Sequence, residues 1–177
     1  EEFESNFAGY IEKGVRDSGM SRDEYLAKVK RQYDGFRFAP GCETVYNPVS
    51  IGKFFTTGHG VDFDNYWSET GGTQLLMDIA RKVNFNVLTD FSKTMNSESL
   101  KVFDILSLAS KDVSVSDLMA LLLQTGYLTI DREKPGAREG TKDYFLRFPN
   151  GEVENSFVNQ LLNASVRMDV SKKNTIL

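Results

Sequence analysis

Apolar positions recur at helical spacing in the first third of the chain, and they predict an amphipathic helix over residues 2–17. A second helix is expected after residue 20, because Ser21 and Glu24 match a capping box, in which each side chain bonds the backbone N–H of the other residue. The apolar stripes of the two helices contain Phe3, Phe7, Tyr10, Ile11 and Val15 in the first, and Tyr25, Leu26, Val29 and Tyr33 in the second.

The pattern then changes to runs of aromatic and β-branched residues. YDGFRF and ETVYN flank the turn sequence APGC and predict a β-hairpin, in which Gly35 is expected to relax the strand backbone. Asn47-Pro48 predicts the start of a helix, because Asn is a favoured N-cap and proline suits the first helical position. A helix over residues 73–83 and a short strand over residues 86–88 are expected next.

The last third of the chain has an order of elements typical of a winged-helix unit. Helices are predicted over residues 100–110 and 114–125, the second of them capped by Ser114 or Ser116. The strands YLTIDRE and DYFLRF follow, on either side of the charged loop KPGAREGTK, and a closing helix begins at residue 151.

These elements together predict a mainly α fold with small β-hairpins, of the α+β class. We expect a helical region with a hairpin over residues 1–95, a winged-helix-like region over residues 96–170 and a frayed tail over residues 171–177. The composition agrees with a globular protein, because 40% of the 177 residues are hydrophobic and 26% are charged.

Charge and cysteine content limit the setting and the partners. The net charge of −4 argues against general binding of polyanions. Cys42 is the only cysteine, which excludes an internal disulfide and favours a reducing, cytoplasmic setting. No apolar run approaches membrane-spanning length, so no membrane partner is expected. The chain begins with Glu1 rather than Met, within a helical pattern, so we expect a segment of a longer protein.

Motifs for catalysis are largely missing. The only Gly-Lys pair, Gly52-Lys53, lacks the first glycine and the final Ser or Thr of a phosphate loop. Ser50 and Lys53 form the S-x-x-K pattern of some acyl-transfer enzymes, but the companion motifs S-D-N and K-T-G are absent. The alternative interpretation is two polar positions early in a helix. No lysine follows an acidic residue by two positions, so the PD-(D/E)XK nuclease motif is absent as well.

Ligand sites receive equally little support. Cys42 and His59 are the only residues of their types, too few for a zinc site, and we predict no metal. A helix start at residues 71–73, with the sequence Gly-Gly-Thr, could offer backbone N–H groups to an anion, or could be only a flexible entry to the helix.

Nucleic-acid binding is the alternative that the winged-helix order raises. The predicted recognition helix, residues 114–125, contains no Lys or Arg. The charged loop KPGAREGTK and the adjoining strand ends would form the wing, and they carry four cations. Asp131, Glu133 and Glu139 offset these charges in sequence, so the basic patch usual in nucleic-acid binders is missing. The candidate nucleic-acid contacts are Arg132, Lys134, Arg138 and Lys142.

Five segments in a fixed order resemble one known family: YDGFRF, VYNPVSI, NYWSETGG, LLLQTGYLTI and YFLRFPNGEVENSF. The chain resembles, over about residues 10–162, the back part of the predicted AAA-ATPase-like proteins, which often carry a PD-(D/E)XK-type nuclease domain. In that family the phosphate loop and the Mg²⁺-binding acids precede the YDG segment, and the nuclease motif follows the FPN segment.

The resemblance therefore implies that this chain is the connecting helical portion, with a lid-like and a winged-helix-like region. It implies no catalytic residue and no cofactor in this segment, while ATP and Mg²⁺ would belong to the parent protein. The implied partner is the ATPase core upstream in the same polypeptide, or another protein. Candidate nucleotide-facing or interaction residues in the shared segments are Asp34, Arg37, Trp67 and Glu69.

Three functions follow as hypotheses. The first is a non-catalytic regulatory or interaction segment of an AAA-ATPase-like protein. The second is a winged-helix nucleic-acid binder, and the third is an unrecognised hydrolase that uses Ser50 or Cys42.

Overall fold

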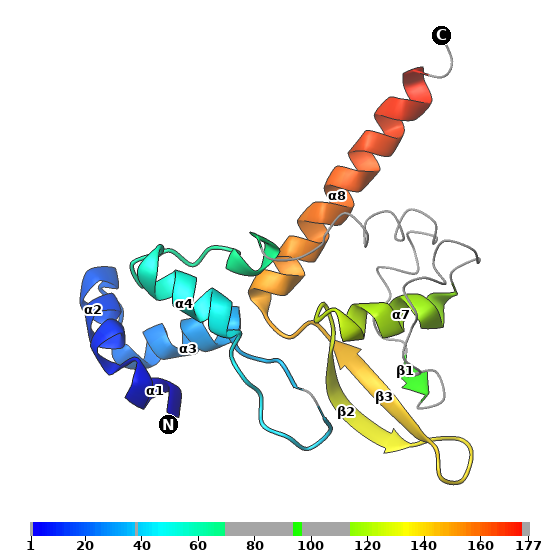
Figure 1. Cartoon of the computed structure of the whole chain (residues 1–177), viewed down its shortest axis with the longest axis horizontal. Coiled ribbons are helices and arrows are strands. Elements are labelled where there is room, and N and C mark those ends of the chain that lie inside the picture. Colours follow the sequence, from blue (N-terminus) through cyan, green and yellow to red (C-terminus); the bar gives the residue numbers. More distant parts are fainter. Residues whose placement is uncertain (1, 38, 70–93, 97–113, 175–177) are drawn as a thin grey trace.

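The structure, a computed structural model, describes residues 2–37, 39–69, 94–96 and 114–174 (Figure 1). The described elements fall into two groups. The N-terminal helices α1 to α4 form the first group, and α7 with a small sheet forms the second. Helix α8 begins between them and leads away from both toward the C-terminus (Figure 1). The predicted fold class, mainly α with small β-hairpins, is confirmed.

The first predicted helix is divided in two. Helix α1 covers Glu2–Asn6 and α2 covers Ala8–Ser18, because Phe7 between them has φ −111° and ψ 17°, outside the helical region. Helix α2 ends at Gly19, whose φ of +69° gives a left-handed C-cap.

The next two helices begin as their capping residues predict. Helix α3 covers Arg22–Tyr33, and the predicted capping box between Ser21 and Glu24 is present in both directions. Helix α4 covers Pro48–Thr56, and Asn47 Oδ1 accepts the backbone N–H groups of the first turn. Both starts depend on bonds within three residues, which the sequence alone can indicate.

Among the described residues, the predicted hairpin between α3 and α4 contains one β-bridge. Phe36 and Val45 exchange two backbone hydrogen bonds of 3.3 and 2.9 Å, and Pro40-Gly41 lies in the turn. The backbone N–H and C=O of Arg37, the next residue, face away from this bridge, and both bond Thr129.

The core of the N-terminal group is mainly aromatic. Tyr33 packs against Phe54 with 5.1 Å between the ring centroids, and Tyr25 donates its hydroxyl to the carbonyl of Gly60 at 2.7 Å. Its buried members come from α2, α3, α4 and the short 3₁₀ helix η1, which covers Tyr66–Glu69. They are Ile11, Tyr25, Val29, Tyr33, Ile51, Phe54, Phe55 and Tyr66.

The second group is a three-stranded antiparallel sheet with helices. Helix α7 covers Val115–Gln124, and of the two candidate caps the structure selects Ser114. Strand β2 covers Thr129–Pro135 and β3 covers Lys142–Arg147, and β1, Thr94–Asn96, pairs with β3 to give the order β1-β3-β2.

Not all expected elements of this part of the chain can be compared. The sequence did not predict β1, since the strand expected nearest to it covered residues 86–88. The helices expected over residues 73–83 and 100–110 and the strand expected over residues 86–88 lie outside the described residues.

Helix α8 covers Gly151–Asn174 and reaches into the stretch predicted as a frayed tail. Its first turns complete the second core, where Val153 and Phe157 pack with α7, β2 and Trp67. Within the described residues, none of the helices combines the length and apolar character needed to cross a membrane.

Candidate functional site

The YDG segment lies where the two groups of elements meet. Asp34 follows the last residue of α3 and is 5% exposed. One of its carboxylate oxygens accepts the Gly35 N–H at 2.6 Å, and the other accepts the Thr44 hydroxyl at 3.1 Å. Tyr33 is buried, with its hydroxyl donating to the carbonyl of Asp64. The polar groups of this segment thus shape the chain after α3.

Gly35 has a more specific role than the relaxed strand that the sequence suggested. Its φ of +111° is rarely open to other residues, and a Cβ at this position would collide with the backbone carbonyl of Pro149. Pro149 belongs to the FPNG segment before α8. Two of the segments that carry the family resemblance are therefore in direct contact, although 114 residues separate these two positions in the sequence numbering.

Arg37 joins the two groups a second time. Its backbone N–H donates to Thr129 Oγ1 at 2.7 Å, and the Thr129 hydroxyl donates back to the Arg37 carbonyl at 2.9 Å. Its guanidinium donates to the carbonyl of Asp131 at 2.6 Å. Arg37 Nε is buried and has no hydrogen-bond partner among the described residues. The structure thus directs this candidate nucleotide-facing arginine toward strand β2.

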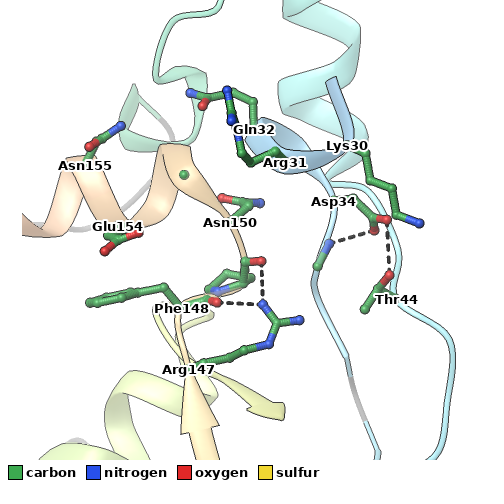
Figure 2. A pocket seen from close by; sticks show the side chains of 13 residues that line it. Lys30, Arg31, Gln32, Asp34, Thr44, Arg147, Phe148, Asn150, Glu154 and Asn155 are labelled. Carbon is green, nitrogen blue, oxygen red and sulfur yellow. Dashed lines mark hydrogen bonds between the residues drawn. The ribbon is translucent and has the colours of Figure 1, made fainter. Parts of the chain in front are cut away.

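A cavity of about 610 Å³ opens at this meeting point (Figure 2). Figure 2 shows the Arg147 guanidinium turned toward the carbonyls of Phe148 and Pro149, each 2.9 Å from its Nη1, and Asn150 at the start of α8. The lining carries both signs of charge. It consists of Lys30, Arg31, Gln32, Asp34, Gly35, Thr44, Arg147, Phe148, Pro149, Asn150, Gly151, Glu154 and Asn155.

A second groove, of about 900 Å³, lies between α1, α3 and the residues of the β-bridge. Asp34 and Arg37 both line it, so the structure brings these two candidates together. Its other lining includes several aromatic and aliphatic side chains. Those are Phe3, Phe7, Leu26, Val45, Tyr46 and Ile51.

Trp67 and Glu69 lie in η1, apart from this groove. Trp67 is 8% exposed and meets the ring of Tyr127 edge-on, with 4.5 Å between the centroids. The backbone of Glu69 closes η1, and its side chain is outside the described part. Trp67 therefore acts in the second core and offers little surface to a ligand.

Glu152 is a buried carboxylic acid that the sequence analysis did not select as a candidate. Its side chain has no exposed surface, and its Oε2 accepts the Trp67 N–H at 3.1 Å. Burial raises the pKa of Glu152 to about 7, and the nearby Ser50 hydroxyl and the backbone N–H groups of Trp67 and Tyr66 favour the charged form and offset part of that rise. A signal was available, because Glu152 and Val153 precede Ser156 and Phe157 by one helical turn, on the buried face.

The wing cations are paired with acids. Lys142 Nζ lies 2.7 Å from Glu133, Lys134 lies 3.8 Å from Asp143 and Arg132 lies 3.8 Å from Asp131. Arg132 and Lys134 also cover the ring of Phe145, at 4.3 and 5.2 Å from its centroid. Arg138 is exposed in the wing loop.

The predicted recognition helix, α7, has a buried middle. Five consecutive residues are 4% exposed or less, so this stretch contributes to the core and offers no face to a groove of DNA. They are Leu118, Met119, Ala120, Leu121 and Leu122.

The remaining sequence candidates lie apart from any cavity described above. Ser50 has no exposed surface, so a substrate carbonyl could reach it only after rearrangement of α4. Cys42 and His59 are exposed. The helix start at residues 71–73 lies outside the described residues. In the part of the chain that the structure describes, no three His, Cys, Asp or Glu side chains gather to hold a metal ion.

Comparisons with known proteins add no relative. No family model, no curated protein and no solved structure matches this chain, so the resemblance to the AAA-ATPase-like proteins stays a prediction.

Proposed function

We propose that this chain is a non-catalytic regulatory or interaction segment of an AAA-ATPase-like protein, which docks on the ATPase core upstream in the same polypeptide. The observation that carries the proposal is the contact between the YDG and FPNG segments. Gly35 lies against Pro149, and Asp34 uses both carboxylate oxygens within its own loop. Residues of the resembling segments therefore fix the backbone and join two regions.

The N-terminal helices offer a surface for such docking. The groove of about 900 Å³ exposes aromatic and aliphatic side chains of α1 and α3 together with Val45. Val45, which lines the groove, is 44% exposed, and Phe3 and Leu26 in the same lining are partly exposed. Exposed apolar side chains that cluster around a groove are typical of protein interfaces.

The first test is to read the parent reading frame upstream of Glu1. A phosphate loop there is the expected result, and an upstream region without one would contradict the proposal. The upstream core, purified separately, should then bind this chain in calorimetry.

Variants of the exposed apolar residues make the binding test specific. Val45→Ser should weaken binding roughly tenfold, because it removes apolar contact area worth about 1–2 kcal/mol. Val158→Ser is the matched control, since Val158 is 45% exposed on α8 and lies outside the groove. Equal affinities for wild type and both variants would place the interface elsewhere and remove the support from this surface.

A further inference from the structure

Two buried polar atoms lie where α4, η1 and α8 meet. Ser50 Oγ on α4 and Glu152 Oε1 on the first turn of α8 have no hydrogen-bond partner of good geometry in the described part of the chain. Both residues are completely buried. The second carboxylate oxygen, Glu152 Oε2, accepts the backbone N–H of Trp67 at 3.1 Å. A single side chain therefore connects α8 to η1 and faces α4.

A buried carboxyl with one unpartnered oxygen is costly as an anion. The neutral acid avoids this cost, because a protonated carboxyl has no charge to remove from water. The direction of the pKa agrees with this account. Burial raises the pKa of Glu152 to about 7, and the Ser50 hydroxyl acts in the opposite sense by favouring the charged form.

Among the described residues, no cation contributes to the pKa shift of Glu152. Tyr33 on α3 and Tyr66 in η1 are buried nearby, while Asp64 is exposed and accepts the Tyr33 hydroxyl through its backbone carbonyl. Glu152 and Asp64 both raise the pKa of the Tyr33 hydroxyl, as negative neighbours do. Among the described residues, these surroundings favour the neutral acid.

We propose that Glu152 is a proton-controlled latch, which holds η1 and α4 against the start of α8 while its carboxyl is neutral and releases η1 when the carboxyl becomes charged. Trp67 would move with η1, and its backbone N–H bond to Glu152 and its edge-on contact with Tyr127 would then be broken. This inference is independent of the proposed function, since it rests on contacts within the chain alone.

The fluorescence of Trp67 tests the latch, because Trp67 is the only tryptophan in the sequence. Its emission is titrated between about pH 5.5 and 8, a range in which histidine is the only side chain whose unperturbed pKa lies. The wild-type emission should change with a midpoint near the pKa of about 7, and Glu152→Gln, which stays neutral, should show no transition.

Two controls separate this transition from other titrations. His59→Gln removes the only histidine, and Glu154→Gln removes an exposed carboxyl two residues along α8. Both should keep the wild-type transition. A wild-type emission that stays flat, or the same midpoint in Glu152→Gln, would overturn the proposal.

A second variant keeps the proposal testable even where Glu152→Gln does not fold. Ser50→Ala removes the hydroxyl that favours the charged carboxyl, so the midpoint should move to higher pH. A midpoint that stays in place or moves to lower pH would also overturn the latch. Circular dichroism of each variant at about pH 6 establishes that it is folded.

Discussion

Replacing Gly35 by alanine should destabilise the protein more than any other single methyl addition to the described loops. Two costs act together. The φ of +111° is unfavourable for a residue with a Cβ, by about 1–3 kcal/mol. The new Cβ also collides with the carbonyl of Pro149, which is held by the Arg147 guanidinium at 2.9 Å. Moving that backbone costs roughly 1–3 kcal/mol, as overpacking does elsewhere.

We therefore expect Gly35→Ala to lower the free energy of unfolding by at least about 2 kcal/mol. For a domain of this size that corresponds to a fall in Tm of at least roughly 4–8 °C. Urea denaturation followed by circular dichroism measures the first quantity, and a thermal scan measures the second.

Two other glycines provide matched controls. Gly41 has φ +76° but open space around its Cα, so Gly41→Ala reports the backbone cost alone. Gly52 lies inside α4 with no neighbour where a Cβ would stand, so Gly52→Ala should stabilise by about 0.5–1 kcal/mol. If Gly35→Ala costs no more than Gly41→Ala, the close approach to Pro149 contributes nothing and the reasoning fails.

Three further outcomes are expected. The pKa of Glu152 is about 7 in the folded chain against an ordinary 4.5, so the stability that the neutral carboxyl contributes is complete below about pH 4.5 and is lost as the pH rises through 7. The unfolding free energy of wild type minus that of Glu152→Gln should therefore fall by about 3 kcal/mol over this range. An unchanged difference would contradict the burial argument. Asn47→Ala should cost about 1 kcal/mol in urea denaturation, because Asn47 Oδ1 accepts two N–H groups of α4, whereas a loss below about 0.3 kcal/mol would mean that the cap is dispensable. Duplex DNA should show no change in fluorescence anisotropy at micromolar protein and low salt, because the wing cations Arg132, Lys134 and Lys142 are paired; salt-sensitive binding would restore the nucleic-acid alternative.

Local signals account for what the sequence predicted well. Three helix starts have a side chain that accepts backbone N–H groups within three residues, so neighbouring residues in the sequence indicate them. They are the capping boxes at Ser21 and Ser114 and the cap at Asn47. Residue preferences indicated the turn after α3, but they could not show that the Arg37 backbone bonds Thr129, which lies 92 positions away.

The candidate site was harder to predict because its parts come from distant segments. Asp34 and Arg37 were selected from the resemblance, but the role of Gly35 depends on Pro149, which no local pattern connects to it. Glu152 was passed over because glutamate is usually exposed, although its position on the apolar face of α8 was visible in the spacing.

The reciprocal bonds between Arg37 and Thr129 also bear on how the chain folds. They join residues 92 positions apart, and the bond from Trp67 to Glu152 spans 85. Closing such long loops costs entropy before any contact compensates it, which slows folding. During synthesis the N-terminal helices can therefore form early, but the segment after α3 has only the bonds within its own loop until β2 and the FPNG segment have left the ribosome. The two regions should accordingly reach their final state in one late, cooperative step.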